Sequence, residues 1–296
     1  MATLWLFTPT RESKHSPRIG KQITHVNQTV LTLQNPWVTD SVIMAKLYLA
    51  MILVVGAVVY AEVLDDVRNS MLTHMYPTMV LLLCPLTFLP CLAYRIYFIK
   101  KRSAIYFNRA TQKIYYKRPG RLFTFEWSDV CGGVFRRTEI GGASFTTRYA
   151  LAFAPRRGDG SLHHKDCLWV DSNEPTEPDL KYVAQVWEYL RHFMDHGPDQ
   201  LPSPDEPNWW HKPLHAICLT PAEAWRHYAP WRTGEPGEMQ GKRNWQLPFW
   251  AVLFPYNLTL AMCWYVICRL FDVRAAPAPP EALEETPVQH DRRTHE

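Results

Sequence analysis

The chain has 296 residues and a formal net charge of +4, with 24 prolines, 12 tryptophans and seven cysteines. So small a net charge gives no global case for nucleic-acid binding. The absence of any Cys-x-x-Cys pair argues against a zinc ribbon or a disulfide framework, and it favours a reducing cytoplasm for the soluble part. The mean hydropathy of −0.23 averages long apolar blocks with polar segments, so the local pattern is the better guide.

Residues 1–40 are predicted to form a polar N-terminal segment. Within it, residues 22–34 (QITHVNQTVLTLQ) mix Thr, Val and Ile as β-strands do. We expect this stretch to lend an edge strand to a sheet formed later in the chain.

Two apolar runs, 42–61 and 76–94, predict a transmembrane helical hairpin over residues 41–99. A buried core helix is the alternative for the first run, but a second such run shortly afterwards favours spanning helices. Lys46, near the start of the first run, is expected to snorkel to the lipid headgroups. The connector 62–75 holds three acids, Glu62, Asp65 and Asp66, against Arg68 alone, which predicts that it lies on the external side.

A basic run without any acid follows the second apolar run. Positive charge beside a spanning helix favours the cytoplasmic side, so the first four cations are predicted to set the topology: Arg95, Lys100, Lys101 and Arg102. For the next five, two interpretations stay open: ordinary solvated strand residues, or a surface that meets anionic lipid or an acidic partner. These are Arg109, Lys113, Lys117, Arg118 and Arg121.

Residues 100–198 predict a cytoplasmic antiparallel sheet or small barrel closed by a helix over 177–196. Short alternating segments joined by turn residues indicate the strands: 104–107, 113–117, 121–127, 134–138, 146–154 and 162–171. Thr176 and Asp179 form a capping-box-like start of the helix. Its apolar stripe is Leu180, Val183, Trp187, Leu190 and Met194. Strands closed by one amphipathic helix resemble a pleckstrin-homology-like module in architecture only.

Residues 199–244 are rich in Pro and Trp, and a capping box at Thr220 predicts a short helix over 221–228. Their aromatic side chains can line a membrane interface or pack onto the sheet domain; these are Trp209, Trp210, Trp225, Tyr228 and Trp231. The run 248–271 predicts a third transmembrane helix, kinked at Pro255, with a re-entrant loop as the alternative. The tail 275–296 is predicted to be disordered, on a side that its balanced basic flanks do not decide.

Candidate chemical groups are present but do not assemble. His163, His164, Asp166 and Cys167 are all potential metal ligands, yet strand alternation sends them to opposite faces. His211 and His215 have helical spacing, but Pro213 interrupts it. Glu126 alternates with aromatic residues as an outward strand residue. We therefore predict no catalytic residue, cofactor, metal ion or small-molecule substrate.

Two patches carry a family resemblance: I-Y-F-N-R-x-T-x-K-I-Y (Ile105–Tyr115) and F-x-W-S-D-V (Phe125–Val130). Together with the late Trp-rich stretch, they are similar to an uncharacterised family of bacterial inner-membrane proteins associated with type VI secretion effector gene neighbourhoods. The resemblance covers roughly residues 40–272. It implies a multi-pass inner-membrane protein that acts as an accessory or immunity protein for a secreted toxin, and it carries over no catalytic motif.

The sequence thus predicts a membrane α+β protein with a cytoplasmic soluble domain and no enzymatic activity. Its expected partners are membrane lipids and a protein partner, such as a secreted effector, but no nucleic acid. The alternative is a membrane-bound toxin or enzyme whose site is built from scattered groups such as His163 and Glu126.

Overall fold

The computed structural model shows an α+β protein that divides into two compact units. The sheet unit comprises Met1–Pro36, Arg102–Glu206 and Ala276–Glu296, and the helical unit comprises Trp37–Lys101 and Pro207–Ala275. The structure describes residues 3–20, 22–69, 75–141, 144–156, 162, 166–171, 180–205 and 209–284.

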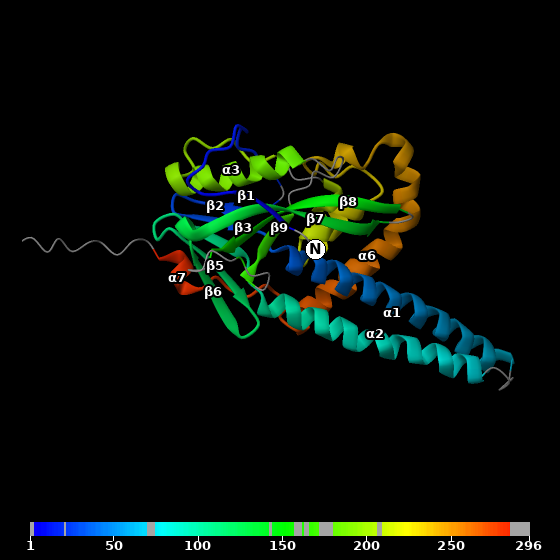
Figure 1. The fold of residues 1–296 in the computed structure, drawn as a ribbon. Coiled ribbons are helices and arrows are strands. Elements are labelled where there is room, and N and C mark those ends of the chain that lie inside the picture. The colour runs from blue at the N-terminus through cyan, green and yellow to red at the C-terminus, as the bar shows by residue number, and fades with distance from the viewer. Residues whose placement is uncertain are drawn as a thin grey trace, which may run out of the picture. The chain divides into compact units, whose positions relative to one another are not determined.

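Two antiparallel sheets form the sheet unit (Figure 1). One has the order β2-β3-β4-β5-β6, with β2 (Ile23–Val26), β3 (Val30–Leu33), β4 (Ile105–Asn108), β5 (Lys113–Arg118) and β6 (Arg121–Glu126). The other has the order β1-β7-β8-β9, with β1 (Thr3–Phe7), β7 (Val130–Gly141), β8 (Ser144–Pro155) and β9 (Leu168–Asp171). The strands predicted between residues 104 and 154 coincide with β4 to β8, and the one predicted over 162–171 is shorter.

The N-terminal segment contributes more than the single predicted edge strand. Residues 22–34 fold into the β2–β3 hairpin, in which β3 lies inside the sheet, paired with both β2 and β4. Asn27 makes the turn, because its side-chain oxygen accepts hydrogen bonds from the backbone N–H groups of Thr29 and Val30. The strand β1, which has only five residues and pairs with β7, was not predicted from the sequence.

The core of the sheet unit is aromatic and is covered by α3 (Leu180–His196). Trp187 of α3 stacks on Trp127 at a centroid distance of 5.3 Å and on Phe7 at 5.8 Å. Gly132 faces the same indole so closely that a Cβ atom there would lie 2.6 Å from it. The predicted stripe is buried except for Leu180, which is exposed at the first turn; the predicted cap at 176–179 lies outside the described residues.

The prediction of a disordered tail is wrong for residues 275–284. A short helix, α7 (Pro280–Leu283), buries Ala282 completely in the sheet unit. The side-chain amide of Asn108 on β4 donates to the carbonyl oxygens of Ala282 and Glu284, at 3.1 and 2.9 Å. A composition-based reading fails here because a few contacts with a sheet suffice to order a short polar segment. Residues 285–296 lie outside the described part.

The helical unit contains three long helices: α1 (Pro36–Asn69), α2 (Met75–Lys101) and α6 (Leu247–Leu270). Two helical segments of the described chain are long and apolar enough to cross a membrane, Pro36–Asp65 and Asn244–Leu270. The predicted second span, 76–94, falls on α2, part of whose side chains lie outside the described set, so it stays a prediction. α1 continues into the predicted connector as far as Asn69, and α6 runs through Pro255 as one helix without a re-entrant break.

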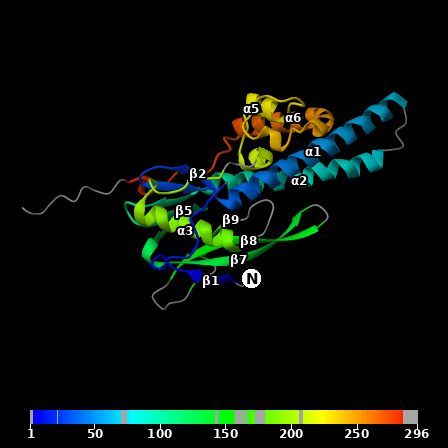
Figure 2. The same cartoon turned by 90° about the horizontal axis from the view of Figure 1, so that it is seen from above.

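One end of each long helix contributes to a shared apolar core. Val42 and Leu49 of α1, Leu92 and Ile99 of α2, and Trp264 of α6 are buried together. The ammonium of Lys46, which was predicted to snorkel to the headgroups, donates to the carbonyl oxygens of Pro213 and Ala216. Figure 2 shows the short helix α5 (Pro221–Tyr228) beside α6, with which it makes extensive contacts.

Candidate functional site

The five basic residues predicted to form a lipid or partner surface do not lie together. Arg109 and Lys113 lie near the β4–β5 turn, whereas Lys117, Arg118 and Arg121 lie at the opposite end of β5. Strand alternation separates them further, because Lys113 and Lys117 share one face of β5 and Arg118 lies on the other. The sheet therefore divides the predicted surface into small groups.

Several of these cations already have partners within the sheet unit. The Lys113 ammonium lies 3.1 Å from the Glu126 carboxylate, which raises the pKa of Lys113 through that hydrogen bond. Arg118 donates to the carbonyl oxygen of Cys167 at 2.9 Å and also lies over the ring of Phe123. Glu126 is accordingly the outward-facing strand residue that the sequence predicted.

The residues predicted to set the topology lie at the C-terminal end of α2 and just after it. Lys100 is exposed and donates to the carbonyl oxygen of Phe271 at 2.7 Å, and Lys101 lies over the ring of Tyr97. Arg95 is partly exposed, as is Arg102, whose carbonyl oxygen accepts from the backbone of Ala276.

The candidate metal ligands are not gathered into a site within the described part. His163 and His164 lie outside it, and Asp166 and Cys167 belong to the segment before β9. The rings of His211 and His215 lie 5.8 Å apart, without a third ligand. In the described residues, no group of three His, Cys, Asp or Glu side chains could hold a metal ion.

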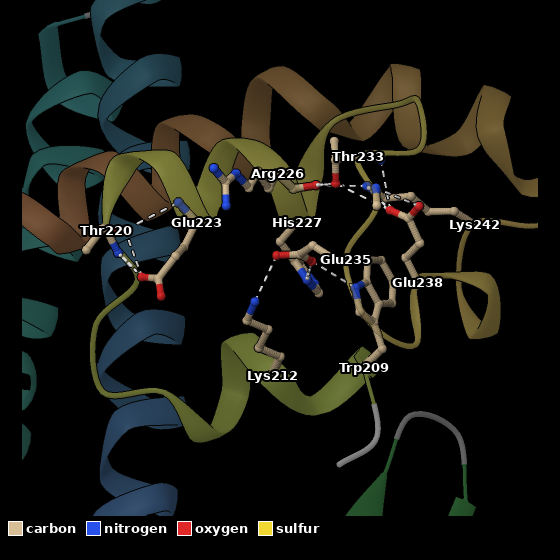
Figure 3. A network of polar contacts seen from close by, with 11 residues as sticks. Trp209, Lys212, Thr220, Glu223, Arg226, His227, Thr233, Glu235, Glu238 and Lys242 are labelled. Atoms are coloured by element: carbon tan, nitrogen blue, oxygen red, sulfur yellow. Dashed lines mark hydrogen bonds and ion pairs between the residues drawn. The ribbon is translucent and has the colours of Figure 1, made fainter. Parts of the chain in front are cut away.

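A buried cluster of charged and polar side chains in the helical unit is the densest polar network in the described part of the chain (Figure 3). It was not predicted from the sequence. We define the cluster by six residues that come from α5, from the segment before it and from the loop after it: Trp209, Lys212, His227, Glu235, Glu238 and Lys242.

Glu235 is the centre of this polar cluster. Its carboxylate accepts from the Lys212 ammonium at 2.8 Å and from the indole N–H of Trp209 at 2.9 Å. Burial by itself would raise the pKa of Glu235, but the hydrogen bonds from Lys212 and Trp209 outweigh burial and lower it. Glu235 is therefore ionised at neutral pH.

His227 lies beside that carboxylate but is held neutral. Its ring stacks on Trp209 at a centroid distance of 4.1 Å, and its Nδ1 lies 3.4 Å from the Glu235 carboxylate. Burial lowers the pKa of His227 to about 4, although Glu235 acts in the opposite direction. The side chain is only 2% exposed, so no solvent is at hand to stabilise an imidazolium.

A second carboxylate and a fully buried lysine complete the polar cluster. Glu238 accepts from the backbone N–H groups of Thr233 and Gly234 at 2.9 and 3.0 Å. The Lys242 ammonium donates to the carbonyl oxygens of Arg226 and Trp231 at 2.9 and 3.1 Å. Burial lowers the pKa of Lys242, and Glu238 partly offsets that effect.

Local sequence features position these side chains. The predicted capping box is present, with Thr220 accepting from the backbone of Glu223 and the Glu223 carboxylate accepting in return, so α5 begins where predicted. Gly241 allows the closest approach to the polar cluster, since a Cβ atom there would lie 2.2 Å from the Trp209 indole. The carbonyl oxygen of Gly241 accepts from the indole N–H of Trp250 on α6.

The aromatic residues of the Pro- and Trp-rich segment 199–244 were predicted either to line a membrane interface or to pack onto the sheet domain. Trp209 is buried in the polar cluster, within the helical unit. Trp210, Trp225 and Trp231 each contact an aromatic side chain of α6 while leaving 43–49% of their own surface exposed. They therefore both pack onto a helix and remain available at the surface.

The arrangement is better suited to holding structure than to performing chemistry. Glu235 and Glu238 are each bonded to two or more protein groups, and both lysines are bonded to protein oxygens. One feature of the cluster could be predicted from the sequence, namely the capping box that places His227 on α5. The loop contacts from residues 233–242 depend on a fold that spacing does not reveal.

Fold and site together define an α+β protein with two antiparallel sheets and two helices of membrane-spanning length and composition. The family of unknown function DUF6708 matches residues 81–288, more than half of the chain, and the protein belongs to that family. Membership of a family of unknown function was predicted from two patches within this range, and that much is confirmed. No curated protein and no solved structure matches the chain.

Proposed function

We propose that the protein is a non-enzymatic membrane protein in which α1 and α2 anchor a soluble sheet unit that binds a protein partner or the anionic leaflet. The observation that carries this proposal is the open apolar surface of α1. Its best window has a mean hydropathy of 2.5, yet only 28% of that window is buried. A core helix of a soluble protein would be mostly buried.

The exposed side chains of α1 form a long apolar surface. They include Met51, Val54, Val58, Val63 and Val67, with exposed fractions of 40–72%. Water is a poor solvent for such a surface, whereas a bilayer core about 30 Å thick accommodates it. Leu83, Leu86 and Leu89 give α2 a similar exposed surface, which supports the hairpin.

The proposed orientation follows from charge. Lys100 and Lys101 are exposed at the end of α2, while Glu62 and Asp65 are exposed near the end of α1. Because cationic flanks favour the cytoplasm, the hairpin would enter and leave on that side, and the sheet unit would be cytoplasmic in a bacterial inner membrane.

Membrane extraction and a topology reporter test the anchor. The full chain should sediment with membranes through a carbonate wash and require detergent for release. A reporter fused after Arg102 should be active only as a cytoplasmic fusion. A full-length protein that stays dissolved as a compact monomer without detergent would overturn the anchor. A reporter active outside the cytoplasm would overturn the orientation.

The proposed absence of enzymatic activity is supported by the polar cluster, in which both carboxylates are committed to protein donors. The rival toxin or enzyme makes a different prediction. Ectopic expression would then arrest growth, and His163→Ala or Glu126→Ala would relieve the arrest. We expect neither the arrest nor the relief.

We propose further, on the family resemblance to proteins near type VI secretion effectors, that the partner is a secreted toxin and the role is immunity or accessory. Deleting the gene should then be harmful only in cells whose siblings carry the neighbouring effector gene. Equal survival of the deletion strain beside toxin-armed and toxin-free siblings would remove this role and leave the membrane anchor untouched.

A further inference from the structure

The helix α6 has two unlike faces, both apolar. Trp250, Trp264 and Cys268 are 2–8% exposed and recur along one face. Phe249, Val252, Tyr256, Val266 and Leu270 are 43–77% exposed and lie on the other face. One side of the helix is therefore covered by protein, and the opposite side offers an apolar stripe to its surroundings.

The covered face meets residues 209–246 at three points. Near the start of α6, the ring of Trp210 lies 5.7 Å from that of Trp250. Trp225 contacts Phe254 at 5.1 Å, and the carbonyl oxygen of Ile217 accepts from Trp264 near the other end. Residues 250 and 264 are about 21 Å apart along a helix, so the cover extends over a distance comparable to a leaflet's hydrocarbon depth or more.

This cover is too polar for the interior of a bilayer. Glu223, Arg226 and Arg232 carry charges on exposed side chains, beside the polar cluster with its two carboxylates. If α6 crossed the membrane, α5 and its loop would be carried into the hydrocarbon together with these groups. Charged side chains at that depth are strongly disfavoured unless they face protein or water.

Chain connectivity gives an independent reason. The sheet unit contains both the residues that follow α2 and the residues that follow α6. The backbone N–H of Ala276 donates to the carbonyl oxygen of Arg102, and α7 is hydrogen bonded to Asn108. Among the described residues between Arg102 and Ala276, α6 is the one helix long and apolar enough to cross a membrane. A single crossing would put the two parts of one folded unit on opposite sides.

The inclination of α6 to the hairpin helix α1 agrees with the argument from chain connectivity that α6 does not cross the membrane. Figures 1 and 3 both show α6 steeply inclined to α1, although the two helices belong to the same unit. Their contact is at the C-terminal part of α6, where Trp264 packs with Val42 of α1 and Ile99 of α2. That is the end of the hairpin that carries the basic residues Lys100 and Lys101.

We infer that α6 lies in the plane of the membrane, at the headgroup level of the cytoplasmic leaflet, with its open apolar stripe in the lipid. The inference rests on the proposed membrane anchor. Basic residues with exposed side chains flank both ends of the helix, Arg243 before it and Arg269 and Arg274 after it, which suits two ends on one anionic surface. Trp225 and Trp231 on the cover and Trp245 just before α6 are also exposed, and tryptophan is favoured at a membrane interface.

The first test asks whether both ends of α6 lie on the same side of the membrane. Arg243→Cys and Arg274→Cys each place a thiol at an exposed position beside one end of α6 in the full chain. In sealed vesicles, a membrane-impermeant maleimide should label both variants from the same side and to a similar extent, after subtraction of wild-type labelling. Labelling from opposite sides would overturn the inference. The membrane anchor would survive that result, because carbonate extraction tests it separately.

Depth is the second test. An environment-sensitive fluorophore on Tyr256→Cys, on the exposed stripe near the middle of α6, should report an apolar surrounding in vesicles containing anionic phospholipid. Spin labels high on the acyl chains should quench it more strongly than labels near the chain ends. The same fluorophore on Glu223→Cys, on the cover, should remain in water. A Tyr256 probe in water would mean that the stripe meets no lipid, and strongest quenching near the bilayer centre would mean that α6 crosses, because residue 256 lies near the middle of the helix. Either result refutes the inference.

Discussion

Acidification should loosen α5 through His227. Burial lowers the pKa of His227 to about 4, against an ordinary value of 6.5 in the unfolded chain. Between these two values the opened state binds a proton that the folded state does not. Because the folded pKa is the lower one, the stability contributed by neutral His227 is complete above pH 6.5 and is lost as the pH falls toward 4.

The size of this effect follows from the two pKa values. From pH 7.5 to pH 5, the free energy of opening should fall by about 2 kcal/mol, a factor of about 30 in the opening equilibrium. Glu235 and Glu238 also have lowered pKa values, so their contributions are lost on acidification too, but below about pH 4.5. The interval down to pH 5 therefore isolates the histidine.

Amide hydrogen exchange over residues 221–228 measures this opening without interference from the sheet unit. After correction for the intrinsic pH dependence of exchange, protection in wild type should fall about 30-fold between pH 7.5 and 5. His227→Gln should abolish the pH-dependent part, since glutamine does not titrate. His25→Gln, at an exposed position in the sheet unit, is the matched control and should change nothing. An equal loss of protection in wild type and His227→Gln would refute the reasoning.

Two further predictions concern packing. Gly241→Ala should destabilise the helical unit by about 1–3 kcal/mol, because the added Cβ overlaps the Trp209 indole. The control, Gly56→Ala, has open space around the added Cβ and should be neutral or slightly stabilising. Thermal unfolding of both variants in detergent measures the difference. Ala282→Asp should release α7, because a buried unpaired carboxylate costs at least about 1.4 kcal/mol. Proteolytic loss of the C-terminal residues should then be roughly tenfold faster or more. Cleavage of Ala282→Asp at the same rate as the control Glu281→Ala, a change at an exposed position, would contradict this prediction.

Local signals were the reliable part of the sequence. The capping box at Thr220 and the proline at the first helical position set the start of α5, and both act within one helical turn. The strands β4, β5 and β6 were predicted because their alternation and their short turns are written in consecutive residues. Their faces were also predicted in part, as the outward orientation of Glu126 shows.

What the sequence concealed depends on distant contacts. The five cations from Arg109 to Arg121 are close in the sequence, but a β-hairpin sends its two ends in opposite directions and its alternate residues to opposite faces. The polar cluster is concealed for the converse reason. Trp209 and His227 belong to separate segments of the chain, and only the fold brings them both to the carboxylate of Glu235.

The path of α6 is the clearest case. Residues 244–270 pass any test based on length and hydropathy, because both faces of the helix are apolar and the sequence does not say that one of them is covered by charged segments. The side on which the helix ends is decided by the next few residues. Their low apolar content predicts disorder, yet Ala276 and Ala282 are built into the sheet unit. On the proposed membrane anchor, a helix whose successor returns to the same folded unit as its predecessor crosses the bilayer an even number of times, and this is the reason for proposing that the single helix α6 lies in the plane of the membrane.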